Sequence, residues 1–131
     1  MRVIFLDDSE ARIKTFLTRV PSAQVARTSW ECIELLKGAE SPVEFLFLDH
    51  DLGGLTFVSP SCENTGMEVV RWMAANKPVV QRVIVHSLNG PAASEMCRSL
   101  ADAGYWVRRV PYLQLSGFLT SQDALPWGLK G

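Results

Sequence analysis

Acidic, imidazole and hydroxyl side chains follow three short apolar runs of this 131-residue chain. The three groups are Asp7-Asp8 after residues 3–6, Asp49-His50-Asp51 after residues 43–48, and His86-Ser87 after residues 83–85. If each run is a strand of an open α/β sheet, the groups meet outside the carboxyl ends of the strands, where such sheets bind ligands. The spacing therefore predicts one functional site built from three strand ends.

The carboxylates of this predicted site suit a hard divalent cation, because Mg²⁺ prefers oxygen ligands. We expect a cation, Mg²⁺ or Mn²⁺, to be held by four acids, namely Asp7, Asp8, Asp49 and Asp51. Two structural roles stay open, because one acid of the first pair could cap the following helix and Asp51 could belong to a turn.

The chain has two histidines, His50 and His86, and both end predicted strands. Imidazole takes up and releases protons near neutral pH, so we expect His50, His86 and Asp49 to be catalytic. The alternative for a histidine at a strand end is a hydrogen-bonded residue of the core. If both imidazoles bound the cation, Mn²⁺, Fe²⁺ or Zn²⁺ would suit the site better than Mg²⁺.

Three further residues are expected to bind phosphate or substrate: Ser87, Asn89 and Arg109. Ser87 could instead satisfy the backbone, and Asn89 is well placed to cap the next helix, whose free N–H groups attract phosphate. Arg108 and Arg109 lie on one predicted strand, and alternation does not decide which of them faces the site.

Strand-like and helix-like stretches alternate along the chain. The predicted strands cover residues 3–6, 24–27, 44–48, 83–85 and 105–110. The predicted helices begin after the caps Ser9 and Ser29, cover residues 66–76 and 91–103, and end with a short helix near residues 113–119. This alternation predicts an α/β fold with a doubly wound, five-stranded parallel sheet of order 2-1-3-4-5, as in flavodoxin.

The length predicts a single domain over residues 1–131. Residues 52–65 are rich in glycine, serine and proline but also hold apolar residues, so we expect a partly packed flap over the site. Residues 124–131 are expected to form a flexible tail.

Composition argues against several classes of partner. The net charge is −1 and the basic residues are spread, so no nucleic-acid-binding patch is expected. No apolar run reaches the ~20 residues that span a bilayer. The three cysteines show no CxxC spacing, which favours reduced thiols and a cytoplasmic location.

Several segments together resemble the receiver domain of response regulators, over about residues 1–111. Asp7-Asp8 resembles the receiver's acidic pair, and Asp49 resembles its phospho-accepting aspartate at the end of a strand. Residues 65–70 resemble the opening of the receiver's third helix, and residues 83–87 its strand ending in Ser or Thr. Two departures stand out: Val110 occupies the place of the receiver's lysine before proline, and the segment after Asp49 is longer.

A second likeness is more specific. The patterns Leu-Asp-Asp at 6–8, Asp-His-Asp-Leu-Gly at 49–53 and His-Ser-x-Asn at 86–89 are similar to the group of cyclic-phosphate-processing receiver domains. This resemblance implies a metal-dependent phosphodiesterase, or processing enzyme, for cyclic phosphates or cyclic nucleotides. Two other functions stay open: a receiver that takes phosphate on Asp49, and a module that binds a phosphorylated ligand or a partner protein without turnover.

Overall fold

The computed structural model describes residues 2–38, 42–52, 59 and 61–121. Five parallel strands form one sheet in the order β2-β1-β3-β4-β5, which confirms the predicted fold class. The strands are β1 (Val3–Leu6), β2 (Gln24–Ala26), β3 (Val43–Leu48), β4 (Val80–Val85) and β5 (Val107–Arg109). The helices are α1 (Glu10–Arg19), α2 (Ser29–Lys37), α3 (Gly66–Asn76), α4 (Gly90–Asp102), the 3₁₀ turn η1 (Tyr112–Gln114) and α5 (Leu115–Leu119).

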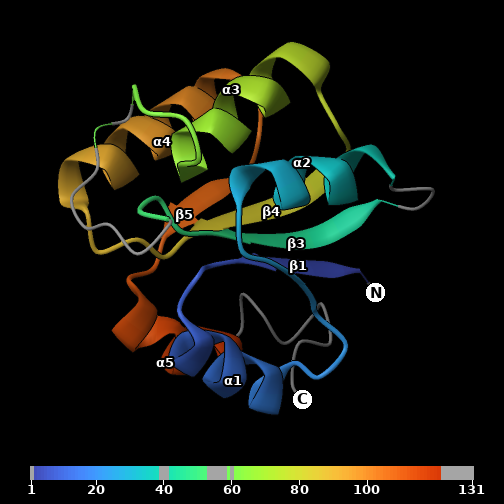
Figure 1. Ribbon diagram of the computed structural model, residues 1–131, viewed down its shortest axis with the longest axis vertical. Coiled ribbons are helices and arrows are strands. Elements are labelled where there is room, and N and C mark those ends of the chain that lie inside the picture. Colours follow the sequence, from blue (N-terminus) through green and yellow to red (C-terminus); the bar gives the residue numbers. More distant parts are fainter. Residues whose placement is uncertain (1, 39–41, 53–58, 60, 122–131) are drawn as a thin grey trace.

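The sheet lies between two layers of helices (Figure 1). Helices α2, α3 and α4 cover one face, and α1 and α5 cover the other. Because successive side chains of a strand point to opposite faces, β3 divides its residues between the two cores. Leu46 and Leu48 pack with α2–α4, whereas Phe45 and Phe47 pack with α1 and α5. All four are fully buried, as expected of a central parallel strand.

Polar caps fix where the helices begin. Ser9 and Asn89 accept backbone N–H hydrogen bonds at the starts of α1 and α4, which confirms both predicted caps. The predicted cap of α2 was wrong by one residue. Thr28 has the extended backbone of a cap and accepts from the N–H of Glu31, whereas Ser29 is the first helical residue.

The ends of the predicted flap are joined by an antiparallel bridge between Asp51 and Thr65. Leu52 beside it is buried in the core. Most of the segment between these ends, and the predicted tail at 124–131, lie outside the described residues.

Candidate functional site

Strand register brings three of the predicted site residues together. Leu6, Leu48 and Val85 are aligned across β1, β3 and β4, and each is followed by a polar residue. The ladder continues one step further, because the N–H of Asp49 donates to the carbonyl of Leu6 and that of His86 to the carbonyl of Leu48. Asp7, Asp49 and His86 therefore follow three aligned strand ends and meet at the carboxyl edge of the sheet.

These three side chains form a compact, buried group. One ligand atom from each of Asp7, Asp49 and His86 lies within 4.8 Å of the others. Asp7 is fully buried, Asp49 is 5% exposed and His86 is 1% exposed. Two carboxylates and one imidazole are a donor set that divalent cations use, so the residues fit a metal ion such as Mg²⁺ or Mn²⁺.

Arg12 of α1 adds a cation to this group, and the sequence analysis missed it. Its Nε lies 2.9 Å from Oδ2 of Asp7, and its Nη2 lies 3.1 Å from Oδ1 of Asp7 and 3.4 Å from Oδ2 of Asp49. Ser9 caps α1 directly after the acids, so the first turn of the helix lies over the strand ends. The sequence shows only a basic residue three positions after a predicted cap, and this spacing alone does not place its side chain on the acids.

Asp7 is held in its ionised form by its partners. Burial would raise the pKa of Asp7, but the hydrogen bond and charge of His86, the N–H of Ser9 and the guanidinium of Arg12 outweigh it and lower the pKa. Nε2 of His86 lies 3.1 Å from Oδ2 of Asp7. The imidazole of His86 also stacks on the ring of Phe5, with centroids 4.9 Å apart, which fixes its plane.

Asp49 behaves in the opposite way. Burial and the charge of Asp7 raise the pKa of Asp49 to about 6, although His86, the N–H of His50 and Arg12 act against this shift. A carboxyl whose pKa is raised by burial beside other charged groups is typical of functional sites.

His50 and Asp51 belong to a second polar group. Nδ1 of His50 lies 2.8 Å from Oδ1 of Asp51, and the amide of Asn89 donates to the same carboxylate oxygen at 3.0 Å. Nε2 of His50 is buried and has no hydrogen-bond partner within the described part of the chain. Ser87 accepts a hydrogen bond from the N–H of Asn89, so its hydroxyl also serves the start of α4.

The remaining predicted site residues lie around these two groups. Asp8 is half-buried and is not one of the three clustered metal-ligating side chains, although its charge acts on Arg12. Nη2 of Arg109 donates to the carbonyl of Ser87 at 3.2 Å, whereas Arg108 lies over the ring of Trp106. Arg109 is therefore the arginine of β5 that approaches the predicted site.

A separate hollow lies between α1 and the segment formed by η1 and α5, with a volume of about 150 Å³. Its walls are mostly apolar and include Phe16, Leu115 and Leu119. None of the clustered acids or histidines lines it, so the reactive groups of the described chain lie elsewhere. No helix in the described ranges is both long and apolar enough to cross a membrane.

Solved structures share this fold. The receiver domain of a putative LuxO repressor from Vibrio parahaemolyticus has a TM-score of 0.60 at 18% identity, covering 98% of this chain and 95% of that one. A response regulator from Colwellia psychrerythraea has a TM-score of 0.64 at 19% identity, covering 91% and 93%. A CheY-like receiver domain protein from Methanospirillum hungatei has a TM-score of 0.54 at 14% identity, covering 97% and 98%.

At these identities the solved structures show the fold, not the activity. Among curated proteins, none matches this chain. The family model described as the cyclic-phosphate processing receiver domain matches residues 2–102, which include both polar groups at the edge of the sheet. This chain therefore belongs to the family of cyclic-phosphate processing receiver domains.

Proposed function

We propose that this receiver domain hydrolyses a cyclic phosphate ester in the crevice formed by Asp7, Asp49 and His86. The observation that supports this most is the convergence of the three ligand atoms within 4.8 Å at the carboxyl edge of the sheet. The family's description points to the same class of substrate.

A divalent cation, Mg²⁺ or Mn²⁺, would be held by the carboxylates of Asp7 and Asp49, which leaves His86 free for proton transfer. When bound, such a cation polarises a phosphoryl oxygen and lowers the pKa of a water molecule. Asp8 and Asp51 would add negative charge near the cation without binding it directly.

The chain's own residues would carry out the proton transfers. The ionised carboxylate of Asp7 orients the imidazole of His86 through Nε2, and we assign to His86 the donation of a proton to the leaving oxygen of the opened ring. Asp51 orients His50 through Nδ1 and leaves its Nε2 unpaired. We assign to His50 the removal of a proton from the attacking water. We assign phosphate binding to Ser87, Asn89 and Arg109.

The test is hydrolysis of a panel of cyclic nucleotides with Mg²⁺ or Mn²⁺, with a chelator as the blank. We expect His86→Gln and Asp49→Asn each to lose at least a hundredfold in rate, the usual size of a lost acid–base group. The exposed Arg98→Gln on α4 is the control and should keep full activity. Full activity in both His50→Ala and His86→Ala would rule out the mechanism.

Phosphorylation of Asp49 is the second candidate, since Asp49 directly follows β3 and lies beside Asp7 on a receiver fold. Two observations disfavour it: Asp49 is only 5% exposed, and Val110 stands before the proline that ends β5. Incubation with acetyl phosphate and Mg²⁺, followed by intact-mass measurement, decides the matter. An unchanged mass would remove this candidate, and a phosphate adduct absent from Asp49→Asn would favour it.

A further inference from the structure

The guanidinium of Arg12 occupies the space between the two buried carboxylates. It makes ion pairs of 2.9 Å with Asp7 and 3.4 Å with Asp49. The guanidinium of arginine stays protonated in proteins. Arg12 is therefore a permanent cation, and these ion pairs tether it to the carboxylates.

Those carboxylates are the groups that would hold a divalent cation, and their ligand atoms lie within 4.8 Å of each other. A metal ion on Asp7 and Asp49 would lie within a few ångströms of the guanidinium, and like charges at that distance repel strongly in a partly buried site. The side chain of Arg12 and a divalent cation therefore compete for the same oxygens.

The backbone of Arg12 is held in place, whereas its side chain is partly open to solvent. The hydroxyl of Tyr112 donates to the carbonyl of Arg12 at 3.3 Å, which ties this turn of α1 to η1. The side chain itself is 32% exposed, and its guanidinium lies 5.6 Å from the centre of the Tyr112 ring. Rotation of the side chain would take the guanidinium toward solvent without moving α1.

We propose that Arg12 is a further phosphate-binding residue of this site, besides Ser87, Asn89 and Arg109, and is released for that role when a divalent cation takes its place on Asp7 and Asp49. A guanidinium matches two phosphate oxygens with two parallel hydrogen bonds, and the metal beside it would face the same phosphate. The cation and the phosphate then bind cooperatively, since each favours the same position of Arg12. This inference rests on the proposed function and names a further phosphate contact.

The experiment measures Mn²⁺ affinity by calorimetry at pH 8, with and without inorganic phosphate. At this pH the carboxyl of Asp49, whose pKa is about 6, is ionised. We expect Arg12→Gln to bind Mn²⁺ alone about tenfold more tightly, because a neighbouring charge changes carboxylate affinities by at least that factor. Phosphate should tighten Mn²⁺ binding in the wild type and have a much smaller effect in Arg12→Gln.

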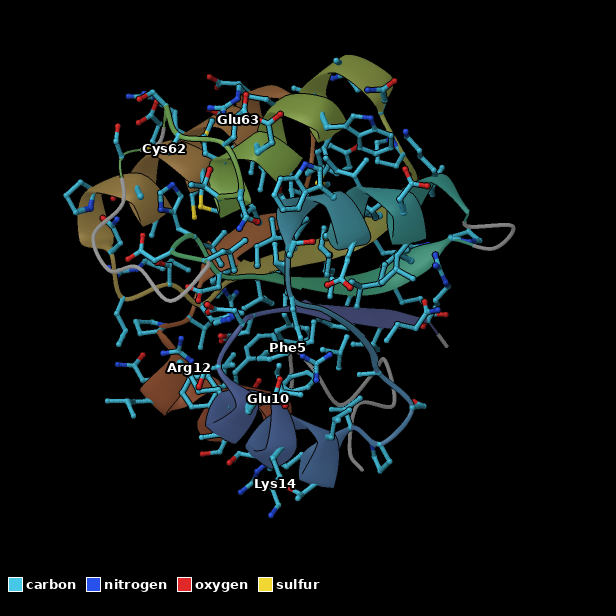
Figure 2. All side chains as sticks on the ribbon, viewed as in Figure 1. Phe5, Glu10, Arg12, Lys14, Cys62 and Glu63 are labelled. Atoms are coloured by element: carbon cyan, nitrogen blue, oxygen red, sulfur yellow. The ribbon has the colours of Figure 1, made fainter. Side chains whose placement is uncertain are left out.

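Lys14→Gln is the matched control, because Lys14 belongs to the same helix and lies on its outer side, away from the sheet (Figure 2). It should bind Mn²⁺ as the wild type does. Arg12→Lys keeps the charge but lacks the fork that spans two carboxylates, so its Mn²⁺ affinity should rise about threefold. Thermal melting reports whether each variant is folded. If Arg12→Gln does not fold, the Mn²⁺ affinity of Arg12→Lys is compared with that of the wild type instead.

Unchanged Mn²⁺ affinity in the folded variants would overturn the proposal, as would an equal effect of phosphate in Arg12→Gln and the wild type. Absence of Mn²⁺ binding in every protein would overturn it too. These outcomes differ from a failure of the proposed enzymatic activity. If Mn²⁺ and phosphate bind cooperatively but no cyclic phosphate is hydrolysed, only the proposed activity is refuted. Hydrolysis without coupling refutes only the role of Arg12.

Discussion

Two carboxylates that share one guanidinium have opposite pKa shifts, and the reason lies in their remaining partners. Asp7 accepts from the N–H of Ser9, from Arg12 and from the imidazole of His86. Asp49 accepts the N–H of His50 and a long contact from Arg12, so burial dominates its titration. The two acids therefore contribute to folding stability with opposite signs at neutral pH.

Asp49→Asn is expected to stabilise the metal-free protein. The folded-state pKa of about 6 lies above the ordinary value of 3.8 for an aspartic acid, so the proton on Asp49 favours folding. That contribution is complete below about pH 4 and is lost as the pH rises through 6. Urea unfolding at pH 8 should show Asp49→Asn more stable than the wild type by about 3 kcal/mol.

The same measurement at pH 4 provides the control for Asp49→Asn. There the wild-type carboxyl is protonated and closely resembles the amide, so the two free energies of unfolding should agree. A variant that is less stable than the wild type at pH 8 would show that the contact with Arg12 outweighs burial.

Asp7→Asn should have the opposite effect. The pKa of Asp7 is lowered in the folded protein, so its ionised form stabilises the fold above pH 4, and the contribution is lost as the pH falls through the folded-state value. At pH 7 the substitution leaves Arg12 and His86 without their buried partner, at a cost of about 3 kcal/mol. Urea unfolding at pH 7 and at pH 3 should show the full deficit at pH 7 and a smaller one at pH 3. Equal deficits at both would assign the loss to packing.

At the scale of elements, the start of α3 touches the site through a glycine. A Cβ atom built on Gly66 would lie 2.0 Å from the carbonyl oxygen of Asp49 and 2.6 Å from Cε of Met96. The methionine tip can move, but the backbone of Asp49 is fixed by its hydrogen bond to Leu6. The first turn of α3 therefore depends on a residue without a side chain.

Gly66→Ala is expected to destabilise the fold by about 2 kcal/mol, since the helix must shift away from the strand end. Gly90→Ala is the matched control, because Gly90 is the first residue of α4 and a Cβ there meets nothing within 4 Å. It should be neutral or slightly stabilising. Thermal unfolding compares the two variants, and equal melting temperatures would contradict the close contact at Gly66.

Element boundaries were predictable where the residue pattern and the capping residues agreed. The strand Val3–Leu6 and the helix Gly66–Asn76 were predicted at both ends, because apolar runs meet clear stop signals there. The strand β4 starts three residues before the prediction, at Val80. The polar pair Gln81-Arg82 hid this extension, although Val80 pairs with Val43 and Arg82 is accommodated against the ring of Trp106.

The site was predictable only where strand register determines it. Asp7, Asp49 and His86 meet because parallel strands align their ends, a rule that can be applied to the sequence. Arg12 was missed because its role depends on how α1 crosses the sheet, and no spacing rule gives that angle. The contact between Arg109 and Ser87 likewise depends on the twist of the sheet at β5.

At the scale of the whole molecule, one sheet separates two cores. The reactivity of the cysteine thiols can be used to test how the core under α2–α4 opens. Cys32 of α2 is fully buried in the core beneath α2–α4, and burial raises the pKa of its thiol to about 12. Cys62 is exposed and Cys97 is half-buried, with a pKa raised by burial. Figure 2 shows Cys62 at the outer rim of the same layer.

Reaction with an aromatic disulfide reagent at pH 8 should therefore proceed in separate phases. Cys62 should react at once, Cys97 more slowly, and Cys32 at least a thousandfold more slowly than Cys62, because α2 must leave the sheet to expose it. Cys62→Ser should remove the fast phase and leave the slow one unchanged. If Cys32 reacted as fast as Cys97 while circular dichroism stayed native, α2 would open locally, and the layer above the sheet would not unfold as one unit with the strands that hold Asp7, Asp49 and His86.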